Sequence, residues 1–146
     1  MQMYRYDTNS IVINCNNTNN ISIINLLNYF SKEDTIYLYG NNELEEISEN
    51  YLNVVYLNDI KELKKYQKIS KKLSQFNKKI ESLLLLQEYE LLNTETYIIY
   101  EICNLLEETQ KNKLNVNKMK YKIIKYLERR NKKELSNKVI KIKAYD

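Results

Sequence analysis

Apolar residues recur with a helical period across the middle of the chain, in residues 58–92. They follow one another at steps of three or four: Ile60, Leu63, Tyr66, Ile69, Leu73, Phe76, Ile80 and Leu83. This spacing places them on one face of a helix, and nothing in the stretch breaks a helix. Asp59 followed by Glu62 has the pattern of a capping box, which marks a helix start. The pattern therefore predicts one long central helix over 58–92.

The middle of this helix has the alternating spacing of a coiled-coil seam. Its seam residues lie four and three apart: Ile69, Leu73, Phe76, Ile80 and Leu83. The seam covers about two heptads, which is shorter than a true coiled coil requires. We expect it to pack against the C-terminal helices of the same chain, and a homodimer through the seam is the alternative. The leucines at 83–86 are apolar on all sides, so we expect this end to be the most deeply buried.

Before the central helix, short β-branched runs alternate with segments of helical period. Strands are predicted at 10–15, 35–39 and 51–57, and helices at 19–31 and 43–49. This order, with its brief connections, is typical of a small parallel α/β layer with right-handed crossovers. The strands are almost continuously apolar, as a sheet covered on both faces requires.

After the central helix, two further helices are predicted at 95–110 and 116–130, and the segment 132–145 follows them. Together they could form a helix-turn-helix-like head, in which the last piece, VIKIKAY, is a short strand or a wing. The expected fold is α+β and rich in helix. It has a small α/β lobe of about three strands at 1–57 and a helical part at 58–146. We expect the two parts to form one compact unit.

The net charge of +4 conceals a gradient along the chain. Residues 1–60 hold two bases and eight acids, a net charge of −6, and residues 61–110 hold eight of each. Residues 111–146 hold thirteen bases and three acids, a net charge of +10. Such asymmetry indicates that the two ends meet different partners or each other.

The predicted helix at 116–130 separates an apolar side from a basic stripe. The apolar side consists of Val116, Met119, Ile123 and Leu127. The basic stripe consists of Lys118, Lys122, Lys125 and Arg129. At about 100° per residue the stripe residues fall within roughly 60° of one another, opposite the apolar side. Contact with phosphates is the functional interpretation, with Arg130 beside the stripe and Tyr121 and Tyr126 as flanking stacking groups. A solvated helix face is the alternative.

The residue inventory excludes several chemistries. The chain has no histidine and one glycine, so Ser–His and Cys–His nucleophiles, glycine-rich phosphate loops and the usual zinc sites are excluded. Cys15 and Cys103 are far apart, and no signal peptide precedes them, so we expect reduced thiols in a cytoplasmic protein. The longest apolar run, 83–86, is far below the ~18–20 residues of a membrane span. No cofactor, metal or membrane is expected.

One resemblance to an enzyme family concerns the start of the chain. The piece IVINCNNTNN, followed by a helix and DTIYLYGNNE, resembles the opening of PIN-like nucleases of the NYN type. That resemblance implies a metal-binding Asp near the end of the first strand, where this chain has Asn14, Asn16 and Asn17 instead. A neutral amide is a poor substitute for a metal-binding carboxylate. Asp7 lies before the strand, and we interpret Asp34 and Asp59 as turn and cap residues.

Two function classes follow, neither of them enzymatic. The first is an accessory protein that binds nucleic acid or a nucleoprotein through the basic C-terminal helix. The second is a small inhibitor or adaptor that acts by protein–protein binding and is encoded by a phage or virus. The excess of Asn, Lys, Ile and Tyr, whose codons are AT-rich, fits such an AT-rich genome. A degenerate relative of the PIN/NYN nucleases is a further alternative.

Overall fold

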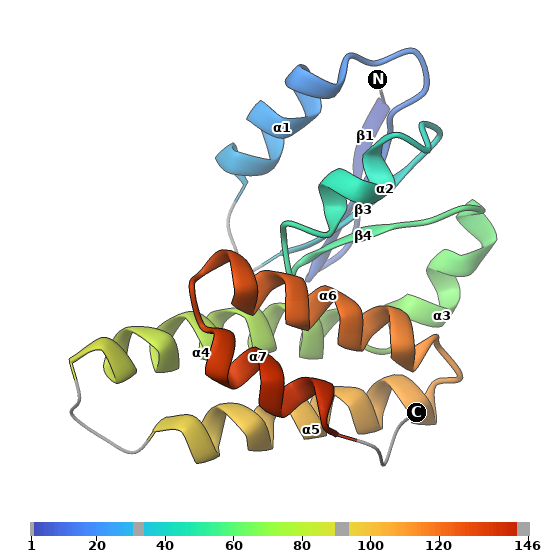
Figure 1. The fold of residues 1–146 in the computed structure, drawn as a ribbon. Helices are drawn as coiled ribbons and strands as arrows, with labels where there is room; N and C mark the ends of the chain where they lie inside the picture. The colour runs from blue at the N-terminus through green and yellow to red at the C-terminus, as the bar shows by residue number, and fades with distance from the viewer. Residues whose placement is uncertain (1, 31–33, 90–93, 143–146) are drawn as a thin grey trace.

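The computed structural model describes residues 2–30, 34–89 and 94–142, in which a small sheet is followed by a layer of helices (Figure 1). The sheet lobe contains β1 (Gln2–Asp7), β2 (Ser10–Asn14), α1 (Asn20–Tyr29), β3 (Thr35–Tyr39), α2 (Leu44–Ser48) and β4 (Val54–Tyr56). The helical part contains η1 (Ile60–Glu62), α3 (Leu63–Gln67), α4 (Ser70–Glu88), α5 (Thr94–Lys111), α6 (Val116–Arg129) and α7 (Lys133–Ile140). The α+β, helix-rich fold class predicted from the sequence is confirmed.

The sheet has the order β1-β2-β3-β4, and its last three strands are parallel as expected. β1 was not predicted, and it pairs antiparallel with β2. A tight turn joins them, because the Asp7 carboxylate accepts hydrogen bonds from the Asn9 backbone N–H and the Ser10 hydroxyl, both at 2.8 Å. An Asp side chain that binds backbone two residues on is a common way to stabilise a turn.

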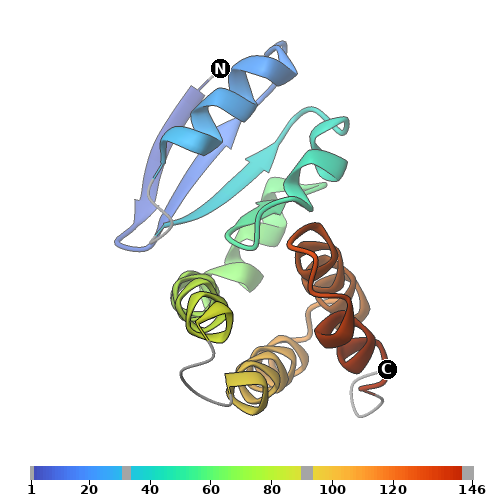
Figure 2. The same ribbon diagram turned by 60° about the vertical axis from the view of Figure 1, so that its left-hand side comes forward.

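Helices cover both faces of the sheet. Ile13 and Leu38 point toward α1 and α2, while Val12, Tyr37 and Val55 point toward the helical part. Figure 2 shows α1 over one face of the sheet and α4 on the other side. The near-continuous burial of β2 and β3 is what coverage on both faces requires.

The predicted central helix is interrupted, which corrects the sequence interpretation. The capping box of Asp59 and Glu62 is present, but α3 ends at Gln67 and α4 begins at Ser70. Side chains of β3 stabilise the interruption. The Thr35 hydroxyl donates to the Ser70 carbonyl at 2.8 Å, and the Tyr37 hydroxyl contacts the Ser70 hydroxyl. Residues 90–92 of the predicted helix lie outside the described residues.

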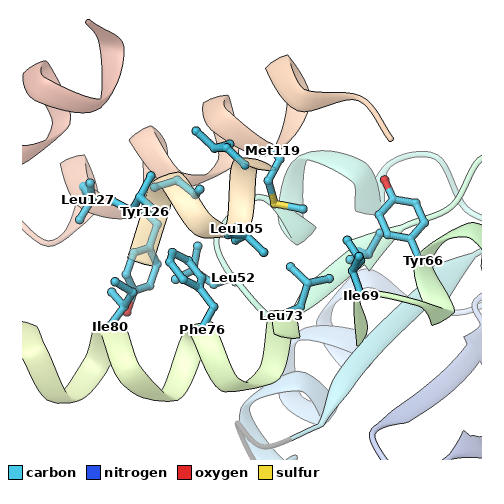
Figure 3. Close-up of a cluster of buried hydrophobic side chains, with 14 of the residues drawn as sticks. Leu52, Tyr66, Ile69, Leu73, Phe76, Ile80, Leu105, Met119, Tyr126 and Leu127 are labelled. Carbon is cyan, nitrogen blue, oxygen red and sulfur yellow. The ribbon is translucent and has the colours of Figure 1, made fainter. Parts of the chain in front are cut away.

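The predicted seam packs inside the chain. Ile69, Leu73, Phe76 and Ile80 are at most 4% exposed and point toward Leu105, Met119 and Leu127 (Figure 3). These four side chains therefore have almost no surface to offer a second copy of the chain, whereas Leu83 is partly buried. Leu84 is buried but Leu85 is 54% exposed, so the end of α4 is less enclosed than its composition predicted.

The C-terminal segment contains α7, which ends at Ile140. Val139 and Ile140 belong to α7, so this part of VIKIKAY forms neither a strand nor a wing, and residues 143–145 lie outside the described residues. Within the described part of the chain, no helix is both long enough and apolar enough to cross a membrane.

Candidate nucleic-acid interface

Helix α6, which carries the predicted basic stripe, lies between α7 and the edge of the sheet (Figure 1). Asn115 caps the start of this helix, because its side chain accepts a hydrogen bond from the Lys118 backbone N–H at 3.0 Å. Met119, Ile123 and Leu127 are buried as predicted. Other residues of α6 are buried as well, because the helix has neighbours on more than one side.

Lys122 is a buried residue, so the prediction that it lies on the exposed face is wrong. It is 9% exposed, and its amine donates a hydrogen bond to the Val54 carbonyl. The backbones of Asn53 and Leu57 bond to β3. Alternate residues of a parallel strand bond to the same neighbour, so the backbone of Val54 faces the free edge of the sheet. The lysine satisfies this carbonyl and cannot reach a phosphate from its position.

Two other predicted site residues pair with acids of the same chain. The Lys118 amine lies 3.3 Å from the Glu45 carboxylate of α2. The Arg130 guanidinium donates to Glu81 at 2.8 Å and lies 4.6 Å from the centre of the Tyr126 ring. Such partly exposed pairs contribute only about 0–1 kcal/mol each, so they could reopen. The acids nevertheless offset the positive potential that a phosphate would meet.

The remaining members of the predicted site are more exposed. The Lys125 amine lies 3.7 Å from Glu128 and 5.3 Å from the centre of the Tyr121 ring, which is 47% exposed. Arg129 is exposed and makes no ion pair with a described residue. Tyr126, the second expected stacking group, is 5% exposed and donates its hydroxyl to Glu81 instead. It is therefore not available to a base.

A second basic surface lies on η1, α3 and the start of α4. We call it the lysine surface, and it consists of Lys61, Lys64, Lys65, Lys68 and Lys71. All five are exposed, and none forms an ion pair with any residue that the structure describes. They lie outward because Leu63, Tyr66 and Ile69 of the same segment face the core.

The sequence contains a signal for this surface that the charge analysis missed. Residues 61–72 hold six lysines and one glutamate, yet they fall in a longer segment, 61–110, whose charges balance. The acids nearest in sequence are committed to the helix start. The Asp59 carboxylate accepts from the Lys61 backbone N–H at 2.9 Å, and Glu62 accepts from the Asp59 backbone N–H at 3.3 Å.

The carboxyl ends of the parallel strands, where the nuclease resemblance would place a metal, carry amides. The Asn14 side chain accepts from the Asn16 backbone N–H at 3.0 Å, and Asn41 donates to Asn20 at 3.1 Å. Gly40 has a φ of +93°, and a Cβ there would lie 2.8 Å from the Asn14 side-chain oxygen. The described residues contain no cluster of three or more His, Cys, Asp or Glu side chains suited to a metal.

The acids considered for a metal have other roles in this structure. Asp7 holds the β1–β2 turn, Asp34 lies 3.0 Å from the Arg5 guanidinium, and Asp59 caps η1. Burial raises the pKa of the Cys15 thiol to about 11 and also raises the pKa of Cys103. Both thiols stay protonated near neutral pH, which makes them poor nucleophiles.

Comparisons of the chain with protein families, with curated protein sequences and with solved structures found no match.

Proposed function

We propose that the protein is a non-enzymatic accessory protein that binds nucleic acid, alone or in a nucleoprotein, through the lysine surface. One observation carries this proposal: five exposed lysines gather on η1, α3 and the start of α4 without an ion pair to a described residue. The proposal keeps the function class expected from the sequence. It places the binding site on the lysine surface instead of on α6. Such a protein would act in the cytoplasm.

Free ammonium groups suit a phosphate backbone because binding releases the counterions that surround the nucleic acid. Ammonium groups already paired with carboxylates contribute less binding free energy, since each pair must open before a phosphate can replace the acid. Two residues of the stripe on α6 are of this second kind, because Glu45 and Glu128 lie beside Lys118 and Lys125, and Lys122 is buried, which leaves Arg129. The lysine surface therefore offers the more favourable electrostatic environment.

The direct test neutralises part of the lysine surface by the triple change Lys64→Gln, Lys65→Gln and Lys68→Gln. Binding to labelled DNA and RNA oligonucleotides is then measured over a range of salt concentrations. Each lost phosphate contact should reduce the slope of log affinity on log salt by about 0.7–0.9 units, so the triple variant should lose about two to three units. Binding should weaken equally across sequences, since phosphates carry no sequence information.

A matched control removes the same charge from lysines that have acidic partners. Lys79, Lys118 and Lys138 pair with Glu101, Glu45 and Glu95, and all three are exposed. Changing these three to Gln should leave most of the salt slope intact, with both variants melting close to the parent temperature. Equal losses in the two variants would mean that net charge alone drives binding, which contradicts the proposal. Absence of salt-dependent binding in the parent would favour protein–protein binding instead.

A further inference from the structure

One amine of α6 makes a buried polar contact with the free edge of β4. Lys122 reaches from α6 to the Val54 carbonyl, which β3 leaves unpaired. A buried backbone carbonyl without a donor is costly, so this contact stabilises the covered edge of the sheet. The cavity beside it is small, about 30 Å³, and Lys122 is 9% exposed. Few water molecules can therefore surround the amine.

Several titratable groups face this cavity from the elements packed around it. Glu45 comes from α2, Glu49 from the residue that follows α2, Tyr56 from β4, Tyr66 from α3 and Lys118 from α6 itself. Among the described residues, no carboxylate lies within ion-pair distance of the Lys122 amine, and Lys118 occupies Glu45 at 3.3 Å. Burial raises the pKa values of both tyrosines, so neither carries a negative charge near neutral pH.

An ammonium ion in such a site lacks a nearby carboxylate to offset the free-energy cost of burying its charge. A neutral carbonyl replaces only part of the hydration of a charged amine, whereas a neutral amine can still donate to that carbonyl. Burial is the main cause that lowers the pKa of Lys122 to about 7, the positive charge of Lys118 lowers it further, and Glu49 opposes them. Geometry and charge thus favour the same, neutral form.

We propose that the contact between α6 and the edge of β4 depends on the protonation of Lys122. The neutral amine holds the two elements together more tightly than the charged amine does. The inference goes beyond nucleic-acid binding, because it concerns how the sheet and the C-terminal helices stay together. It needs no ligand and is tested on the full chain.

The direction of the pH effect follows from the two states of the amine. In the unfolded chain the pKa of Lys122 has its ordinary value of 10.5, and in the folded chain it is about 7. Between these values the unfolded chain binds more protons, so folding becomes more favourable as pH rises. The gain approaches tenfold in the folding equilibrium constant per pH unit, about 1.4 kcal/mol. Below the folded pKa the full penalty for burying the charge is present.

The test compares urea unfolding of the parent, Lys122→Met and Lys125→Met from a pH of about 6 to about 9.5. Methionine keeps the chain length and removes the titrating amine. Lys125 is the control, since it lies on the same helix and its side chain is 38% exposed. The stability of the parent relative to Lys122→Met should rise steeply above a pH of about 7, and Lys125→Met should follow the parent. Equal pH dependence in the parent and Lys122→Met would overturn the proposal.

A second measurement does not depend on the variant folding. The side-chain carbon next to the Lys122 amine can be followed by NMR during a pH titration of the parent. A midpoint near pH 7 is expected from the environment of the amine. A midpoint at the ordinary lysine value of 10.5 would show that the amine is solvated, and the proposal would fail.

Discussion

Two polar side chains connect the sheet to the helices from opposite directions. The Tyr37 hydroxyl reaches from β3 to Ser70 at the start of α4, and the Lys122 amine reaches from α6 to the Val54 carbonyl. The Tyr37 hydroxyl also donates to the Tyr66 carbonyl at 3.3 Å, and its residue is fully buried. Buried polar groups must find partners within the chain, so each of these side chains determines where a helix meets the sheet.

At this scale we predict the effect of Tyr37→Phe, which removes one hydroxyl and keeps the ring. The loss should reduce the free energy of unfolding by about 1 kcal/mol, the usual value for one hydrogen bond. It should not be larger, because Ser70 keeps its own bond to the Tyr66 carbonyl at 3.1 Å. Urea denaturation measures the change. Tyr29→Phe is the control, since Tyr29 is 85% exposed and should leave stability unchanged. Equal changes in the free energy of unfolding of both variants would contradict the inference that the Tyr37 hydroxyl forms a stabilising buried hydrogen bond.

At the scale of elements, the segments predicted correctly are those whose own residues carry the full pattern of a helix or a strand. α6 was predicted with its own apolar side, and β2 and β3 were predicted from their β-branched runs. β1 was missed because its residues are mostly exposed and it becomes a strand by pairing with β2. The interruption before α4 was missed because its hydrogen-bond partners, Thr35 and Tyr37, lie 29 to 35 residues away in sequence.

The burial of two predicted site residues on α6 was missed for a related reason. Helical spacing located the apolar side of α6 correctly. It could not reveal that Lys122 is buried against β4, or that Tyr126 is buried with its hydroxyl bonded to Glu81 of α4. Neighbours from the sheet, and not the period of the helix, determine which lysines are exposed. The lysine surface was readable in the sequence, because Leu63, Tyr66 and Ile69 already marked the inner side of its segment.

The packing of α4 supports a prediction for this element. Phe76→Ala should lower the free energy of unfolding by about 2–5 kcal/mol, since Phe76 is 4% exposed in the main core and truncation leaves a cavity. Leu85→Ala on the same helix should cost much less, because Leu85 is 54% exposed. Denaturant unfolding of the two variants checks both values. A larger cost for Leu85→Ala would mean that the inner face of α4 is misassigned.

At the scale of the whole molecule, the larger of two apolar cores crosses from the sheet lobe to the helical part, and the smaller lies between the sheet and α1 and α2. Val12, Tyr37 and Val55 of the sheet belong to the same buried cluster as the inner residues of α4, α5 and α6. The partners of many lysines also lie on other elements, as in the pairs of Lys72 with Glu108 and Lys118 with Glu45. The core contributes most of the stability of the unit, because exposed ion pairs contribute little.

This shared core predicts that residues 1–57 and 58–146 unfold together. Urea unfolding followed by far-ultraviolet circular dichroism and by tyrosine fluorescence should give coincident transitions, as expected for a single cooperative unit. The two probes are suitable because helices lie mainly in one part, whereas Tyr37 and Tyr66 pack ring to ring across the boundary at 6.0 Å. A fragment of residues 58–146 should unfold without a cooperative transition, since it lacks the sheet side chains that complete its core. Two separated transitions in the full chain, or a cooperative melt of the fragment, would show that the helical part is an independent domain.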